Sequence, residues 1–101
     1  MKKDYKSFSE FYTFYLTEHN NQINRRLHFI GTLLVILTII YVIITRNWPF
    51  LILTPVFGYG FAWIGHFKVE RNKPATFDNP FYSLVSDFVM FKDILMGRIK
   101  L

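Results

Sequence analysis

The sequence predicts an all-α membrane protein, a transmembrane helical hairpin flanked by two interfacial amphipathic helices. Three observations predict this fold class. The chain has 101 residues, a length that suits one domain. It is 51% hydrophobic and 20% aromatic. Its apolar residues are concentrated in the middle of the chain instead of recurring at helical or strand intervals. We therefore expect a single membrane-embedded domain over residues 1–101.

Residues 7–20 are expected to form the first interfacial helix. Ser7 and Glu10 have the spacing of a capping box, which marks a helix N-terminus. Aromatic side chains then recur at helical spacing and would form one stripe that ends at His19: Phe8, Phe11, Tyr12 and Tyr15. A helix with such a stripe is typical of the membrane interface.

The first membrane span is expected at 24–45. From Phe29 to Thr45 the chain has 17 consecutive residues without a charge. This run corresponds to about 26 Å of helix, which can just cross a hydrocarbon core of about 30 Å.

The second span is expected at 49–70, where a further long run is uncharged. Pro49 suits the first position of a helix, and Pro55 predicts a kink. Gly58 and Gly60 are expected to let a neighbouring helix approach closely. Because few residues separate the two runs, the spans must form an antiparallel hairpin.

The distribution of charge predicts the orientation of this hairpin. Of the 12 Lys and Arg residues, Arg46 alone lies in the turn. By the positive-inside rule the side with both termini is cytoplasmic, and we expect a bacterial inner membrane rather than endoplasmic reticulum. His28 stands just before the first run and His66 just after the second, so the hairpin brings both to one depth. A soluble protein with two buried core helices is the alternative, but it leaves too few polar residues to cover them.

The second interfacial helix is expected at 80–96. Asn79 can cap this helix, with Pro80 at its first position. Apolar side chains at helical spacing would form one face: Phe81, Leu84, Phe88, Phe91 and Leu95.

The histidines and one glutamate form the pattern that points to chemistry. His66 and Glu70 are four residues apart, so on a continuing helix they would lie on one face. This spacing suits a shared metal, or a carboxylate that orients an imidazole. His19 and His28 are nine residues apart, on opposite faces of one uninterrupted helix. They converge only if the chain bends, and the amide-rich run 19–24 predicts that bend.

Two histidines and a carboxylate with open positions are typical of an oxygen-activating iron(II) site, and the lack of cysteine excludes thiolate ligands. Either two or all three histidines would bind the metal, with Glu70 as the carboxylate. Asp87 and Glu18 are secondary candidates for that carboxylate. Asn24, four residues before His28, is placed to orient it.

Four cations surround this pattern and would hold an anionic head group whose apolar tail runs into the bilayer: Arg25, Arg26, Lys68 and Arg71. Three aromatic side chains would wall the site from water: Tyr15, Trp63 and Phe67. The extended segment 71–80 is expected to cover it. The same cations and aromatic rings are also typical of a membrane interface without any site.

Two other functions remain open. Two histidines at matched depth on adjacent helices can also ligate haem b. Alternatively, the chain is a non-enzymatic integral membrane hairpin whose histidines are interfacial anchors. The basic residues flank the spans instead of forming a separate stripe, so we expect no nucleic-acid partner. The sequence leaves the oligomeric state open.

Two blocks, FYTFYLTEHNNQINRRLHFIGT and WIGHFKVERNKPA, carry a family resemblance. In the first block a histidine is followed by asparagines and then by a second histidine that leads into an apolar span. In the second, Gly-His is followed four residues later by glutamate and then by Pro-Ala. Over about residues 8 to 91 the chain resembles the membrane-bound 2-hydroxy fatty acid dioxygenases of α-oxidation, a family with many bacterial relatives.

The resemblance implies an iron(II)-dependent enzyme that uses dioxygen to remove one carbon from a 2-hydroxy fatty acid. It also implies that His19, His28 and His66 are needed for activity and bind the metal, with Glu70 as the matching carboxylate. The fungal members are longer and have an acidic residue late in the chain, which in this sequence could only be Asp87.

Overall fold

The computed structural model describes residues 5–74 and 77–101. In these ranges the chain is helical and contains no strand, so the all-α prediction is confirmed. The elements are α1 (Phe8–Thr17), α2 (Gln22–Thr45), the 3-10 helix η1 (Trp48–Ile52), α3 (Leu53–Ile64), the π-helix η2 (Gly65–Glu70) and α4 (Pro80–Leu95). Their bounds lie within three residues of the expected helices.

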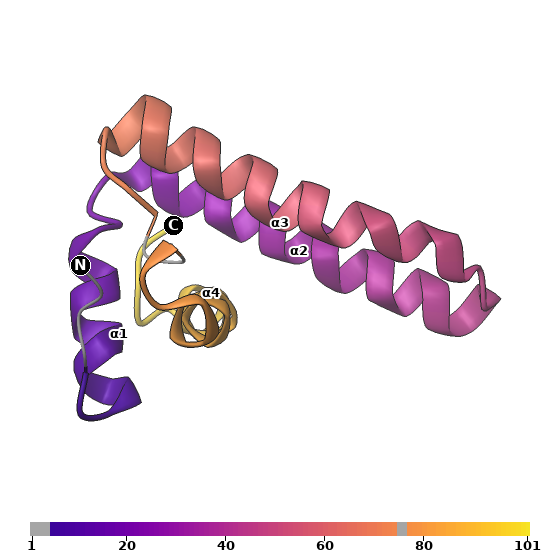
Figure 1. The fold of residues 1–101 in the computed structure, drawn as a ribbon, viewed down its shortest axis with the longest axis horizontal. Coiled ribbons are helices and arrows are strands. Elements are labelled where there is room, and N and C mark those ends of the chain that lie inside the picture. The colour runs from indigo at the N-terminus through magenta and orange to yellow at the C-terminus, as the bar shows by residue number, and fades with distance from the viewer. Residues whose placement is uncertain (1–4, 75–76) are drawn as a thin grey trace.

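α2 lies beside the segment formed by η1, α3 and η2, and the two run in opposite directions (Figure 1). Near the turn, the rings of Tyr41 and Phe50 meet edge to face with centroids 5.2 Å apart. Farther along the pair, Gly31 of α2 faces α3. A Cβ atom on Gly31 would lie 2.8 Å from the backbone oxygen of Phe57, closer than real contacts allow. This glycine therefore permits the close approach of the two helices.

The expectation that Gly58 and Gly60 allow this approach was wrong. A Cβ on Gly58 would make an ordinary contact of 3.5 Å with Val35, and a Cβ on Gly60 would meet nothing within 4 Å. The reason is that a side chain fits at either position without a clash, so the helix packing does not require glycine there. The contact falls instead at Gly31 and, as described below, at Gly65.

Both members of the pair are long and apolar enough to cross a membrane. α2 has 24 residues and the segment Trp48–Glu70 has 23. Only 22% and 17% of their most apolar windows are buried within the protein. Large apolar side chains near the turn are correspondingly exposed, among them Ile44 at 76% and Ile52 at 72%.

α1 and α4 pack against each other at the end of the pair that is remote from the turn (Figure 1). Phe11 and Tyr15 of α1 form a buried cluster with Met90 and Ile94 of α4. The hydroxyl of Tyr12 also reaches α4. It donates a hydrogen bond to Asp93 at 2.7 Å.

The aromatic stripe of α1 therefore forms the core, where the sequence suggested a surface for the membrane. The buried side of α4 carries two small serines, Ser83 and Ser86, ahead of Met90 and Ile94. The expected apolar face of α4 is largely exposed, with Phe81 at 72%, Leu84 at 53% and Leu95 at 64%.

Candidate metal centre

The three histidines converge at the end of the helix pair next to α1. Each offers one ring nitrogen such that all three atoms lie within 4.8 Å of one another. The side chains are buried, with exposures of 1% for His19, 5% for His28 and 2% for His66. Among the described residues, this is the group of donors that could hold a metal ion.

His19 reaches His28 because the chain bends between α1 and α2, as the amide-rich run predicted. α1 ends at Thr17, and α2 begins after Asn21. The Asn21 side chain accepts a hydrogen bond from the N–H of Ile23 at 2.8 Å and so caps the new helix. The Nε2 atoms of His19 and His28 then lie 3.1 Å apart.

His66 joins them because α2 and η2 approach closely at Gly65. A Cβ atom on Gly65 would lie 1.8 Å from Oδ1 of Asn24, which is itself completely buried. Any side chain at this position would push the two helices apart. The imidazole of His66 therefore lies 4.6 Å from that of His19 and 4.9 Å from that of His28, centroid to centroid.

The helix changes to π geometry over Gly65–Glu70, where the sequence predicted a continuing α-helix. Short π segments within helices frequently occur at functional sites. The wider turn directs Glu70 toward the start of α2. There its Oε1 accepts hydrogen bonds from the N–H of Asn21 at 2.5 Å and from Nδ2 of Asn24 at 3.4 Å. A carboxylate at a helix N-terminus is stabilised by the helix dipole.

Glu70 is consequently not brought into the group formed by the three imidazoles. The secondary candidate Glu18 is also outside it, and its backbone oxygen accepts a hydrogen bond from Asn72. Asn24 does face His28, but through its backbone oxygen. Its side-chain Oδ1 is buried without a hydrogen-bond partner among the described residues.

The hydrogen bonds of the rings fix their tautomers. Nδ1 of His19 lies 2.7 Å from the backbone oxygen of Tyr15, and Nδ1 of His28 lies 3.0 Å from that of Asn24. Nδ1 of His66 lies 2.7 Å from Oδ1 of Asn72. Carbonyl oxygens only accept hydrogen bonds, so each Nδ1 must carry the proton. Each Nε2 therefore keeps a lone pair.

Asn72 is the one ring partner that is a side chain. Its Nδ2 donates a hydrogen bond to the backbone oxygen of Glu18 at 3.1 Å, which orients Oδ1 toward His66. The backbone N–H of Asn72 donates a hydrogen bond to the backbone oxygen of His66 at 2.9 Å. The left-handed conformation of Arg71 makes this contact possible. Asn72 was not among the residues predicted from the sequence to form the site, although the segment 71–80 was expected to cover it.

This donor set fits a metal ion. The Nε2 atoms of His19 and His28 cannot hydrogen-bond each other without an added proton, because both are acceptors. Two nitrogen ligands about 2.1 Å from one metal and at right angles to each other lie about 3 Å apart. The observed separation of 3.1 Å agrees with that value. Imidazole ligands suit several divalent metals, iron among them.

Burial and the neighbouring imidazoles keep His19, at the bend, in its neutral form. Burial lowers the pKa of His19 well below its ordinary value, and the nearby His28 and His66 lower it further. Metals bind the neutral imidazole, so this shift favours metal binding over protonation.

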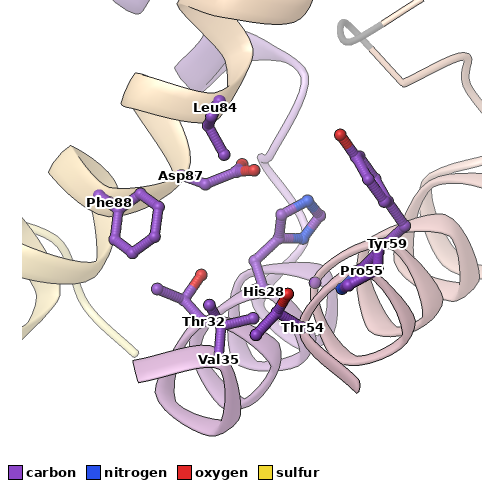
Figure 2. Close-up of a pocket in the computed structure, with 10 residues that line it drawn as sticks. His28, Thr32, Val35, Thr54, Pro55, Tyr59, Leu84, Asp87 and Phe88 are labelled. Atoms are coloured by element: carbon purple, nitrogen blue, oxygen red, sulfur yellow. The ribbon is translucent and has the colours of Figure 1, made fainter. Parts of the chain in front are cut away.

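A cavity of about 230 Å³ opens beside His28, between α2, α3 and α4 (Figure 2). Its wall is mainly apolar, with polar groups from Thr32, Thr54, Tyr59 and Asp87. Figure 2 shows Asp87 extending from α4 toward the imidazole of His28. The hydroxyl of Tyr15 donates a hydrogen bond to this carboxyl group. Burial raises the pKa of Asp87 to about 7, although the Tyr15 hydrogen bond acts in the opposite direction.

A second, smaller cavity of about 20 Å³ lies between the histidines and α4. It is lined by Tyr15, His28, Tyr59, Ala62, Trp63, His66, Pro74, Ser83 and Asp87. Two of the three expected aromatic walls are therefore present. Tyr15 also stacks on His19 with centroids 4.0 Å apart, whereas Phe67 is half exposed.

The four cations are not placed at the cavities: within the described residues, no lysine or arginine lines either one. Arg25 donates hydrogen bonds to the backbone oxygens of His19 and Asn20 and holds the bend. The others are exposed: Arg26, Lys68 and Arg71. The charged side chain that faces the larger cavity is Asp87, which the sequence had ranked behind Glu70.

The fold and the site define a class of protein: an all-helical chain with three buried histidines arranged as metal ligands beside an apolar cavity. A family model described as 2-hydroxy-palmitic acid dioxygenase Mpo1-like matches residues 5–99, and the chain belongs to this Mpo1-like family. The family resemblance read from the two sequence blocks is thereby confirmed. No curated protein and no solved structure shows significant similarity to the chain.

Proposed function

We propose that this protein is an iron(II)-dependent dioxygenase that acts on 2-hydroxy fatty acids or a related lipid and shortens the chain by one carbon. The observation that carries the proposal is the convergence of one ring nitrogen from each of three buried histidines beside a mainly apolar cavity. The name of the family to which the chain belongs supports the same substrate class.

The reaction consumes one 2-hydroxy acid and one dioxygen. The C1–C2 bond breaks, dioxygen is reduced, and the acid one carbon shorter, carbon dioxide and water account for all atoms. When bound, iron(II) supplies open coordination positions and the electrons that activate dioxygen. The chain supplies His19, His28 and His66 as the ligands. Glu70 stabilises the start of α2 and so supports the bend that presents His19.

The substrate is proposed to lie in the larger cavity. Its polar end would lie near His28 and Asp87, and its hydrocarbon chain would contact the apolar wall formed by Val35, Pro55 and Phe88. The buried rings exclude water from the reacting end. The exposed cations Arg26, Lys68 and Arg71 would act earlier, by attracting the anionic substrate to the membrane surface.

We further propose that α2 and the segment Trp48–Glu70 form a transmembrane hairpin in a bacterial inner membrane, with both termini in the cytoplasm. The apolar side chains left exposed on the pair support this placement, because lipid can cover them. The excess of Lys and Arg outside the turn supports the orientation. The histidines would then lie near the cytoplasmic surface of the bilayer.

The geometry disfavours the haem alternative. Axial ligands stand on opposite sides of a haem iron, so bonds of about 2 Å would separate their nitrogens by about 4 Å with the macrocycle between them. The imidazoles of His28 and His66, the pair at matched depth, have ring centroids only 4.9 Å apart, and the Nε2 atoms of His19 and His28 lie 3.1 Å apart. Neither pair leaves room for a macrocycle between its rings.

The test is anaerobic titration of the detergent-purified protein with iron(II). We expect about one iron per chain, and His66→Ala should abolish binding because it removes one of the three ligands. Asn20→Ala replaces an exposed side chain next to His19; it is the control and should bind iron normally. Admission of air with 2-hydroxypalmitic acid should yield the acid one carbon shorter, detected by mass spectrometry. Full retention of iron by His66→Ala, or a Soret band in the purified protein, would overturn the proposal.

A further inference from the structure

α4 carries two buried serines, of which only one lines a cavity. Ser83 is 3% exposed and Ser86 is 0% exposed, and neither hydroxyl has a hydrogen-bond partner among the described residues. An unpaired buried hydroxyl costs free energy, so its presence calls for a reason. Ser83 lines the smaller cavity next to His28 and His66, whereas Ser86 lines neither cavity.

The smaller cavity has room for one small group. Its volume of about 20 Å³ is little more than the 10–15 Å³ or so that a single water requires. Ser83 can donate a hydrogen bond into this space. Asp87 offers a carboxyl group there, one oxygen of which already accepts a hydrogen bond from Tyr15.

A group that fits must be one heavy atom in size and must both accept and donate a hydrogen bond. A hydroxyl group meets both conditions, as does a single water, which the hydroxyl of a bound substrate would displace. Dioxygen cannot donate a hydrogen bond, and a carboxylate has three heavy atoms and is too large for this space. His28, Tyr59 and Asp87 line both cavities, so a molecule held in the larger one can place a short substituent in the smaller one.

We propose that the smaller cavity is the subsite for the 2-hydroxyl group of the substrate, where Ser83 donates a hydrogen bond to it and Asp87 accepts one from it. This inference rests on the proposed function, since it assigns one group of that substrate to one place. It makes Ser83 the residue that distinguishes a 2-hydroxy acid from the unsubstituted acid. A fatty acid without the hydroxyl leaves the buried polar groups unpaired and binds more weakly for that reason.

The experiment measures binding without turnover. The iron(II)-loaded protein in detergent is kept under argon, and the dissociation constants of 2-hydroxypalmitic acid and palmitic acid are measured by equilibrium dialysis. Wild-type protein should prefer the hydroxy acid. Ser83→Ala should reduce this preference about tenfold, the size of one hydrogen bond, chiefly by weakening the hydroxy acid. It should also reduce the preference between the two enantiomers, because the subsite lies on one side of the cavity.

Ser86→Ala is the matched control. It removes an equally buried, equally unpaired hydroxyl from the same helix, so it reproduces any effect on folding but should leave both preferences unchanged. Equal ratios for wild type and Ser83→Ala, with both acids bound, would overturn this inference and leave the proposed function standing. If wild-type protein binds neither acid, the proposed function fails and the inference fails with it.

Discussion

The two ends of the helix pair are built on opposite principles. At the histidine end, polar side chains are buried: His19, Asn24, His28 and His66 are each 5% exposed or less. At the turn end, apolar side chains are exposed, with Ile43 at 64%, Ile44 at 76% and Ile52 at 72%. One end therefore depends on specific hydrogen bonds and close packing, whereas the other depends on its surroundings to cover it.

This difference predicts that stability and function are concentrated at one end. Burial of polar groups is favourable only when each finds a partner, so a small change at the histidine end leaves donors or acceptors unpaired. Side chains at the turn end have few such partners to lose. Substitutions that disturb packing or hydrogen bonds should therefore have larger consequences at the histidine end.

The largest effect is expected for Gly65→Ala. The new methyl group would overlap Oδ1 of Asn24, whose side chain is completely buried. The helices must separate, and His66 moves away from His19 and His28. We expect a loss of about 1–3 kcal/mol in unfolding free energy, together with loss of iron binding. Thermal unfolding in detergent and metal analysis measure the two effects.

Gly60→Ala is the matched control for this change, because a Cβ atom there meets nothing within 4 Å. Alanine favours a helix over glycine by about 1 kcal/mol, so this variant should be more stable and should bind iron normally. If Gly65→Ala and Gly60→Ala behaved alike, the close approach at Gly65 would not be what assembles the three imidazoles.

An intermediate effect is expected for Asn72→Leu. The change removes the acceptor that holds the Nδ1 proton of His66, and with it the bond to Glu18. Loss of such a partner typically weakens metal binding by about 10- to 100-fold. Iron affinity is measured by competition with a chelator. In the metal-free protein, ¹⁵N NMR should show that His66 no longer favours the Nδ1–H tautomer.

Asn72→Asp tests whether the acceptor is what matters. It keeps an oxygen for His66 but loses the donor to Glu18, so iron affinity should stay within a few-fold of wild type. Asn20→Leu is the control: it removes an exposed hydrogen bond from Asn20 Nδ2 to the backbone oxygen of Thr17, so iron affinity should not change. Wild-type affinity and tautomer in Asn72→Leu would contradict this role.

Much of the fold could be predicted because it depends on local patterns. Uncharged runs, caps and the amide-rich segment 19–24 are properties of neighbouring residues, and they gave the helix bounds to within three residues. The bend predicted the meeting of His19 with His28. The antiparallel arrangement predicted that His28 and His66 lie at one end.

The parts that were not predicted depend on contacts between distant segments. The spacing of four residues between His66 and Glu70 does not reveal that the helix changes to π geometry after Ile64. Because of this change, Glu70 lies at the start of α2 instead of beside His66. Asn72 reaches His66 only after this wider turn. The stripe of α1 was read as a surface because its pattern is the same whether lipid or α4 covers it.

The smallest effect allows the most direct comparison of the two ends, because each has an arginine in the same strained conformation. Arg46 follows α2 at the turn and Arg71 follows η2 beside the histidines, both with φ of 58°. Glycine adopts this left-handed conformation without steric cost, although it also loses more entropy on folding. Arg46→Gly and Arg71→Gly should each raise the unfolding free energy by about 0.5 kcal/mol, measured by thermal unfolding in detergent. Neither arginine ligates the metal, so iron affinity should not change. If unfolding free energy rose for Arg46→Gly but fell for Arg71→Gly, the Arg71 side chain would itself stabilise the end of η2. The contrast between the two ends would then include the residues that cap their helices.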